Sequence, residues 1–467
     1  MGSASGLLAN HTTTMFFLSL AADKLTAMPH LGLIFLQRVA TAPIPQPPAD
    51  RTSLELKIIA GLFVLVMLLL DLYVFQAIRT AFGKLPAKKR NYIYGVYWSL
   101  TAITVVLLVA MALIPAPEVS RSFRWAVTGW VSIWVPAKLI VAFFLTVDDL
   151  IRLARWVKSW FVPAPTGMGG ETISRSQFIA QAALVTSSIP VLATSWGIWR
   201  GAYAYRVETV EVPIKGLPKG FDGYRIVQLS DAHTGSFNKH EAVAKGIALA
   251  NAQKPDVIFF TGDLVNNVAD EVADYFDLYA QLKAPGGVYS ILGNHDYGTY
   301  AQWIPKEARE FLVNDVIAMH KKLGWDILLN EHRTLSRNGD QINLLGVENW
   351  GTGRFPRKGD MQKAKANMPN LPVNILMSHD PSHWDAQIRP EHPDISLTLS
   401  GHTHGMQFGV EIPGFKWSPV QYRYKQWGGL YTEGDQHLYV NRGFGFIGFP
   451  GRIGMPPEVT VLVLRQA

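Results

Sequence analysis

The chain of 467 residues contains no cysteine. This absence excludes disulfide bonds, thiolate zinc sites and cysteine nucleophiles, although it says little about the cellular compartment. Charge is also sparse, because Asp, Glu, Lys and Arg make up only 17% of the residues, whereas hydrophobic residues make up 48%. Such hydrophobicity is high for a wholly soluble protein, and the length allows two or more domains. We therefore expect a membrane-embedded part, and any bound metal must be held by nitrogen and oxygen ligands.

Four long apolar runs lie before residue 200, near residues 56–78, 92–114, 125–147 and 178–199. Each is close to the roughly 20 residues that a bilayer-spanning helix needs. Together they predict a transmembrane helical domain over residues 51–200. Residues 1–50 hold only short apolar stretches before a proline-rich segment. Three interpretations stay open: an interfacial segment, part of a targeting sequence, or a start of the sequence that is assigned too far upstream.

Basic residues in the short loops orient this membrane domain. The loop after the first run has five basic residues and no acidic residue, so we expect it in the cytoplasm: Arg79, Lys84, Lys88, Lys89 and Arg90. The loop before the fourth run is also basic, which places everything after residue 200 outside. Much of the net charge of +7 lies beside the apolar runs, so nucleic acid is not an expected partner.

Two ionisable residues, Asp71 and Lys138, fall inside the apolar runs at similar estimated depths. They are interpreted as a buried pair that acts as a packing device, with a transport or sensing role as the weaker alternative. A second interpretation is that Lys138 extends to the membrane surface and Asp71 lies near a helix end.

After residue 205, short β-rich runs alternate with helical stretches, as in a soluble α/β domain. Strands are predicted over residues 225–229, 257–260 and 288–292, and two more apolar runs follow. Each run is followed at once by polar residues that can bind metal, and His402 and His404 have the spacing that points two side chains to one side of an extended chain. Since open α/β sheets bind ligands at the carboxyl ends of their strands, we expect a metal site at the strand ends of a single sheet. Its expected ligands are Asp231, His233, Asp263, Asn294, His379, His402 and His404.

The motifs D-A-H, G-D, G-N-H-D, S-H-D and G-H-T-H, in this order, resemble the signature of the calcineurin-like metallophosphoesterases over about residues 207–467. The resemblance implies an α/β fold, a four-layer β-sandwich flanked by helices, with two divalent metal ions: Mn, Fe or Zn. It implies that the first ion is bound by Asp231, His233 and His404, the second by Asn294, His379 and His402, and that Asp263 bridges both.

The resemblance also implies a reaction in which a metal-activated water attacks the phosphorus of a phosphodiester, phosphomonoester or pyrophosphate. In the G-N-H-D motif, His295 would stabilise the developing charge or protonate the leaving oxygen, and Asp296 would orient the His295 ring.

The stretch YVNRGFGFIGFPGRIGMPPEVTVLVL resembles the ending of a membrane-tethered branch of this family. That branch includes bacterial phosphodiesterases, UDP-diacylglucosamine pyrophosphatases and an animal transmembrane form. Within this stretch, Arg442 and Arg452 are expected either to bind substrate phosphate or to be solvated loop residues. Met406 stands where the branch usually has a glycine, so the pocket wall is expected to differ there.

We therefore expect a membrane-anchored metal-dependent phosphoesterase in a bacterial inner membrane, with its catalytic domain outside the cytoplasm. Lipid-linked and soluble phosphate esters are the candidate substrates. The alternatives are a UDP-diacylglucosamine-type pyrophosphatase, which would face the cytoplasm, a non-catalytic membrane sensor, and a transporter with an accessory domain. Metal identity and oligomeric state stay open.

Overall fold

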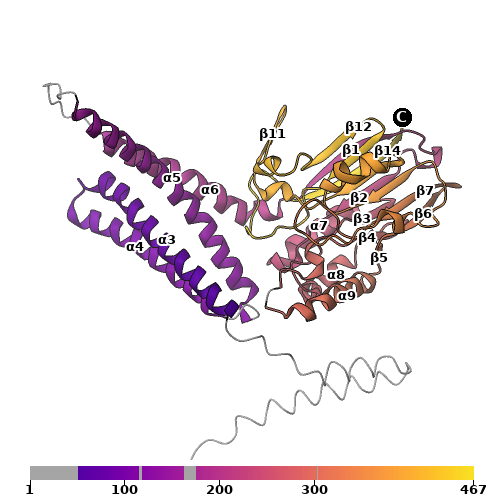
Figure 1. The fold of residues 1–467 in the computed structure, drawn as a ribbon, viewed down its shortest axis with the longest axis horizontal. Coiled ribbons are helices and arrows are strands. Elements are labelled where there is room, and N and C mark those ends of the chain that lie inside the picture. Colours follow the sequence, from indigo (N-terminus) through magenta and orange to yellow (C-terminus); the bar gives the residue numbers. More distant parts are fainter. Residues whose placement is uncertain (1–50, 115–117, 162–174, 302) are drawn as a thin grey trace, which may run out of the picture. The chain divides into compact units, whose positions relative to one another are not determined.

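The computed structural model describes residues 51–114, 118–161, 175–301 and 303–467 (Figure 1). The interpretations offered for residues 1–50 lie outside the described residues. Residues 50–467 form one compact unit, in which four long helices are followed by two β-sheets with shorter helices.

The four long helices are α3 (Arg51–Phe82), α4 (Ala87–Leu113), α5 (Arg121–Ser159) and α6 (Arg175–Trp199). All four are long and apolar enough to cross a membrane, which confirms the four predicted spans. Helix α5 is longer than its predicted span, and at 1.5 Å per residue its 39 residues extend about 58 Å. Ser120 caps its first turn, because the Ser120 side chain accepts a hydrogen bond from the Phe123 N–H.

A buried ion pair joins three of these helices. The Lys138 Nζ of α5 lies 2.8 and 3.0 Å from the two carboxylate oxygens of Asp71 on α3. The Tyr97 hydroxyl of α4 donates to the same carboxylate at 2.8 Å. Both charged side chains are buried, so the interpretation of Asp71 and Lys138 as a buried pair is confirmed. These contacts pair both charges within the helix bundle, as an apolar surrounding requires.

The remaining chain forms two six-stranded sheets. The first has the strand order β1-β14-β2-β3-β4-β5 and the second β12-β13-β9-β8-β7-β6. The first contains β1 (Arg206–Ile214), β2 (Arg225–Leu229), β3 (Val257–Phe260), β4 (Val288–Ser290), β5 (Asp326–Ile327) and β14 (Glu458–Gln466). The second contains β6 (Glu331–Arg337), β7 (Asp340–Gly346), β8 (Asn374–Met377), β9 (Ile395–Ser400), β12 (Gly429–Glu433) and β13 (Gln436–Val440). The predicted bounds of β2 and β3 are confirmed, whereas β4 ends two residues earlier than predicted.

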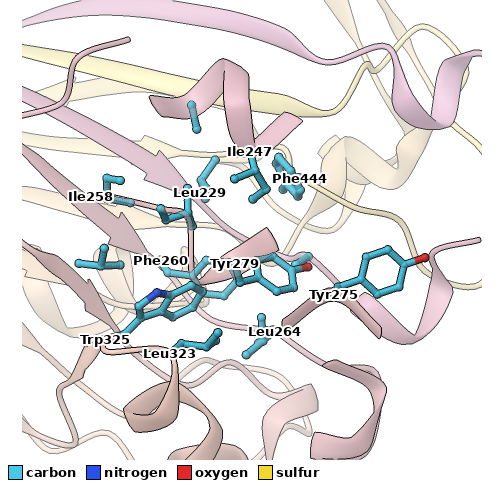
Figure 2. Close-up of a cluster of buried hydrophobic side chains, with 14 of the residues drawn as sticks. Leu229, Ile247, Ile258, Phe260, Leu264, Tyr275, Tyr279, Leu323, Trp325 and Phe444 are labelled. Carbon is cyan, nitrogen blue, oxygen red and sulfur yellow. The ribbon is translucent and has the colours of Figure 1, made fainter. Parts of the chain in front are cut away.

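Alternate residues of β3 show how the layers are built. Val257 and Phe259 face the second sheet and belong to the core between the sheets. Ile258 and Phe260 face the other way, into a core covered by α7 (His240–Ala252), α8 (Phe276–Tyr279) and α9 (Lys306–Lys322), part of which Figure 2 shows. Because both faces are buried, the strand is apolar throughout. A third cluster, which includes Trp384 and Ile388, covers the outer face of the second sheet. This sandwich agrees with the predicted fold class.

The polar residues that follow the strands come from both sheets, and the expectation of a single sheet was wrong. Strands β2, β3 and β4 of the first sheet and β8 and β9 of the second end at the same place. Gln228 at the end of β2 connects the sheets, since its side-chain amide donates to the Ser400 carbonyl of β9 at 2.9 Å. This direct link fixes the two sets of strand ends relative to each other.

The buried ion pair yields a first prediction. Lys138→Met leaves the Asp71 carboxylate buried without a cation, which costs on the order of 3 kcal/mol. We expect a clearly lower melting temperature of the full chain in detergent, followed by intrinsic fluorescence. Adding Asp71→Asn removes the charge but keeps an acceptor for Tyr97, so the double variant should regain most of the loss. A double variant no more stable than Lys138→Met would contradict this account.

Candidate metal centre

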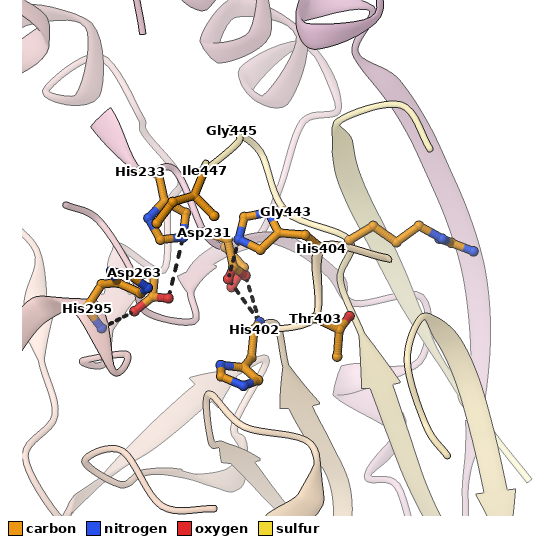
Figure 3. Close-up of polar contacts among 12 residues, drawn as sticks. Asp231, His233, Asp263, His295, His402, Thr403, His404, Gly443, Gly445 and Ile447 are labelled. Carbon is orange, nitrogen blue, oxygen red and sulfur yellow. Dashed lines mark hydrogen bonds and ion pairs between the residues drawn. The ribbon is translucent and has the colours of Figure 1, made fainter. Parts of the chain in front are cut away.

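The side chains predicted at the strand ends lie together in overlapping groups. Figure 3 shows those of Asp231, His233, Asp263, His402 and His404. Within each group, the donor atoms all lie within 4.8 Å of one another. One group contains Asp231, His233 and His404, a second contains Asp263, His379 and His402, and a third contains His233, Asp263 and His295. Asn294 joins the second group, because its Oδ1 lies 2.7 Å from His402 Nδ1. The first two groups match the two ligand sets that the resemblance implies.

Asp263 lies between the two groups. Its Oδ2 is 3.2 Å from His379 Nε2 and 3.5 Å from His233 Nε2. Its Oδ1 accepts a hydrogen bond from the His295 backbone N–H at 2.8 Å. A single carboxylate oxygen therefore faces histidines of both groups, which is the position that a bridging ligand would need.

The backbone at this site is unusual, because five of the seven expected ligands have positive φ. Non-glycine residues seldom adopt this conformation, and it concentrates where function requires a particular side-chain direction. Each turn aims its side chain into the site directly after a strand. The five φ values are 53° for Asp231, 47° for His233, 57° for Asp263, 72° for His402 and 53° for His404.

Glycines allow the two carboxylates to approach the neighbouring backbone. A Cβ placed on Gly293 would lie 2.2 Å from Asp263 Oδ1, and one on Gly401 would lie 2.1 Å from Asp231 Oδ2. Neither distance is possible for real atoms, so only glycine fits. The G-N-H-D and G-H-T-H motifs therefore need their first residue for close approach.

Burial governs the ionisation of the site. It raises the pKa of Asp231 to about 6 and lowers the pKa of His233 to about 3. Burial also works against the charge of Asp263, but neighbouring His379 and His295 hold its pKa well below the usual range. In turn, the pKa of His379 rises to about 10 because Asp263 outweighs burial. Without a metal, a protonated His379 would thus supply the cation that Asp263 needs.

The donor set fits a metal. The Nε2 atoms of His233 and His404 are buried and have no hydrogen-bond partner among the described residues. Buried polar atoms are normally satisfied, and a divalent cation would satisfy both of these. Nitrogen and oxygen donors without thiolate suit Mn, Fe or Zn.

Contacts outside the donor set orient the histidines. The His379 Nδ1–H donates to the Thr261 carbonyl at 2.7 Å, and the His233 Nδ1–H donates to Asn266 Oδ1 at 3.1 Å. Each bond keeps the Nδ1 proton on the side of the ring away from Asp263, so Nε2 of the same ring faces Asp263 and can bind an ion once any proton on it is lost. His402 Nε2 lies 2.7 Å from the Tyr424 hydroxyl, which leaves its Nδ1 for the second group. Such partners fix the tautomer and direction of ligand rings.

Comparisons with known proteins agree with this geometry. Residues 224–406 match the family model described as calcineurin-like phosphoesterase. Residues 56–202 match the model described as probable calcineurin-like phosphoesterase, transmembrane domain. The uncharacterized metallophosphoesterase YkuE of Bacillus subtilis is 32% identical over 280 residues, which are 58% of this chain and 90% of YkuE. The chain belongs to the calcineurin-like metallophosphoesterases.

Two further relatives extend the comparison. The transmembrane protein with metallophosphoesterase domain of Danio rerio is 30% identical over 315 residues, covering 64% of this chain and 68% of the relative. The UDP-2,3-diacylglucosamine pyrophosphatase LpxG of Chlamydia muridarum is 28% identical over 296 residues, covering 53% of this chain and 86% of LpxG. By its name, the Danio rerio relative pairs a transmembrane part with a metallophosphoesterase domain, as the two matched family models do in this chain.

In this metallophosphoesterase, the partner of the His295 ring differs from the expected one. His295 Nδ1 lies 2.9 Å from the Asn266 carbonyl, and its ring stacks on Tyr300 with centroids 4.3 Å apart. The Asp296 carboxylate instead accepts the backbone N–H groups of Asp263 and Gly293, both at 2.8 Å. Asp296 thus holds the loop that carries Asp263, and the expectation that it orients His295 was wrong.

Arg442 and Arg452 are both buried, and the expectation of solvated loop residues was wrong for both. Arg442 forms ion pairs with Glu458 and Glu411. Arg452 donates to several backbone carbonyls, including that of Gly445, and its Nη2 lies 3.3 Å from His404 Nδ1. Their contacts are with protein groups, so the geometry gives no support to phosphate binding by either guanidinium.

Sequence reasoning missed Asn266, which contacts two histidines of the site. Asparagine after a strand is common in turns, so nothing in the sequence separated it from a turn residue. It also borders a cavity of about 490 Å³ whose lining includes Trp125, Trp303 and Phe446. The same lining also includes charged residues, among them Arg121 and Glu271, and Asn266 is its link to the histidines of the site.

Asn266 yields a second prediction. Asn266→Ala removes the acceptor of the His233 Nδ1–H, so we expect Mn²⁺ to bind about 10- to 100-fold more weakly, as loss of such partners usually causes. Asn266→Asp keeps an acceptor and should bind near the level of the unaltered chain. The measurement is calorimetric titration of the chelator-treated full chain, with Asn251→Ala as the control away from the site. Equal affinity in Asn266→Ala and the unaltered chain would refute this role.

Proposed function

We propose that this chain is a membrane-anchored phosphoesterase that hydrolyses phosphate-ester bonds at a site for two divalent ions. The observation that carries the proposal is the position of Asp263 between two groups of donors, one with His233 and the other with His379. Two ions held there would clamp a phosphate group and acidify a water for attack on phosphorus. All seven expected ligands are present around this point, which argues against a non-catalytic sensor.

The chain's own residues supply the remaining steps. Asp231, His233 and His404 would hold one ion, and Asn294, His379 and His402 the other, with Asp263 between them. The Asn266 carbonyl holds the His295 ring through Nδ1, so His295 Nε2 is the atom that can pass a proton to the leaving oxygen. Asp296 keeps Asp263 in position by binding the backbone of its loop.

The substrate class that we favour is a phosphate ester with an apolar part, such as a lipid-linked ester. The membrane helices keep the site near lipid, and the cavity beside Asn266 has three aromatic rings in its wall. A UDP-diacylglucosamine-type pyrophosphatase is the second candidate, because LpxG is among the relatives. Soluble phosphodiesters are the third.

We also propose the domain division and its orientation. Residues 51–200 form the membrane domain and residues 207–467 the catalytic domain. The basic loop at residues 79–90 would face the cytoplasm of a bacterial inner membrane, and the catalytic domain would face outward.

Hydrolysis provides the third prediction. The full chain in detergent with Mn²⁺ should hydrolyse bis(p-nitrophenyl) phosphate or p-nitrophenyl phosphate, and a chelator should stop the reaction. Asp263→Asn should lower kcat/KM more than about 100-fold, since even partners outside the ligand set cost 10- to 100-fold. His295→Ala should lower kcat by about 100-fold or more, as loss of a general acid does, while Mn²⁺ still binds.

The matched control for this experiment is Asp277→Asn, which alters an exposed aspartate outside the site and should leave turnover unchanged. Activity that survives both chelation and Asp263→Asn would disprove the proposed reaction. A chain that binds Mn²⁺ but fails on both aryl esters should then be tested on lipid-linked esters.

Topology provides the fourth prediction, and the absence of cysteine makes it simple to test. Lys322→Cys at the exposed end of α9 should react with a membrane-impermeant maleimide in intact cells. Lys84→Cys in the basic loop should react only after the cells are opened. The reverse labelling pattern would place the catalytic domain in the cytoplasm and favour the pyrophosphatase alternative.

A further inference from the structure

A small hairpin follows the G-H-T-H motif and belongs to neither large sheet. Strands β10 (Val410–Ile412) and β11 (Phe415–Trp417) pair antiparallel, with Val410 opposite Trp417 and Ile412 opposite Phe415. The turn between them is Pro413-Gly414, and Gly414 has φ 78°, as the third position of a type II turn requires. The tip of the hairpin is thus Ile-Pro-Gly-Phe, without a polar side chain.

The charged face of this hairpin points toward the protein and the apolar face points outward, which is the reverse of the usual arrangement. Opposite residues share a face, so Glu411 and Lys416 point one way and their neighbours point the other. The charged face is turned toward the protein: Glu411 forms ion pairs with Arg442 and Arg206. Lys416 lies over the Trp427 ring, 4.3 Å from its centroid.

The apolar face is turned outward. Ile412 is 58% exposed and Phe415 53% exposed, and Val410 and Phe408 are also exposed. A soluble hairpin normally buries its apolar side and exposes its charges. A contiguous exposed apolar surface of this kind marks a contact with something apolar.

The surroundings of the hairpin have the composition of a membrane interface. Met406 and Tyr422 are exposed large side chains close to it in sequence, and Arg423 and Lys425 are exposed cations in the same loop as Tyr422. Tyr422 contacts β11, because its hydroxyl accepts a hydrogen bond from Trp417 Nε1 at 3.4 Å. Exposed aromatic side chains beside an apolar tip are typical of segments that lie at the lipid headgroups.

Contacts at its base connect the hairpin to the fourth membrane span. The Gly409 N–H donates to the Ile453 carbonyl at 2.9 Å, and the Arg452 N–H donates to the Gly197 carbonyl of α6 at 3.2 Å. A Cβ on Gly197 would lie 2.7 Å from Ile453 Cγ1, so the loop packs directly on the helix. In the same turns of α6, Trp196 and Trp199 are exposed, as aromatic residues at the end of a membrane span are.

We propose that the β10–β11 hairpin is a second membrane contact, whose Ile412–Phe415 tip enters the headgroup region of the bilayer that α3 to α6 cross. A lipid surface is favoured over a second copy of the chain because the loop at the base of the hairpin packs on α6 at the end that exposes Trp196 and Trp199. The hairpin starts six residues after His404, so this contact would hold the loop that carries His402 and His404 beside the lipid surface. The proposal does not depend on the chain being a hydrolase.

The test uses single cysteines in the cysteine-free full chain, reconstituted in vesicles of phosphatidylcholine and phosphatidylglycerol. Ile412→Cys and Phe415→Cys, each in a separate variant, carry a polarity-sensitive nitrobenzoxadiazole label. Ser336→Cys on β6 is the matched control, because it is an exposed residue of another hairpin. Brominated lipids act as quenchers that reach only labels in the bilayer.

The expected result is a blue-shifted emission at positions 412 and 415 that loses intensity with brominated lipid, and an unshifted, unquenched emission at 336. Bromines near the headgroups should quench more than bromines deep in the chains, since interfacial segments lie about 5–10 Å into the boundary. A water-like, unquenched emission at both tip positions would overturn the proposal. A blue shift without lipid quenching that fades on dilution of the protein in lipid would also overturn it, and would assign the hairpin to a contact between copies.

Discussion

Three buried carboxylates lie close together at the site: Asp231, Asp263 and Asp296. The contacts around the site depend on the need to compensate these three groups. A buried charge is tolerated only when hydrogen bonds or opposite charges compensate it. Asp296 binds backbone N–H groups from two loops, and Asp231 accepts the His402 N–H. Asp263 is compensated by His379 and by the His295 N–H. Histidines and, in our account, divalent ions supply the positive charge that the backbone cannot.

The two-sheet architecture is what brings these groups together. The first sheet supplies the carboxylates, and the second supplies His379, His402 and His404. Strands from two sheets can end at one point only if the loops after the strands turn tightly. The glycines and the positive φ angles of five expected ligand residues make such tight turns possible. The membrane helices meet a separate constraint of the same kind, because Asp71 and Lys138 are both buried and form an ion pair. Both halves of the chain therefore contain buried charges that are compensated by nearby groups.

Much of this arrangement could be predicted from the sequence, because apolar strands with polar ends and runs of about 20 apolar residues leave clear patterns. The position of the seven expected ligands was predictable for this reason. The contribution of two sheets was not predicted from the strands, since strand ends look alike whichever sheet they belong to. Asn266, Tyr424 and the role of Asp296 depend on contacts between distant loops, which no local pattern records. The burial of Arg442 and Arg452 also escaped prediction, because their acidic and carbonyl partners lie in other segments.

The central claim is that Asp263 lies between two metal ions. The most direct test is the metal content of the full chain after equilibration with Mn²⁺ and removal of free ions, measured by plasma mass spectrometry against protein concentration. Our account predicts two ions per chain. A single ion per chain at saturation, or none, would contradict it.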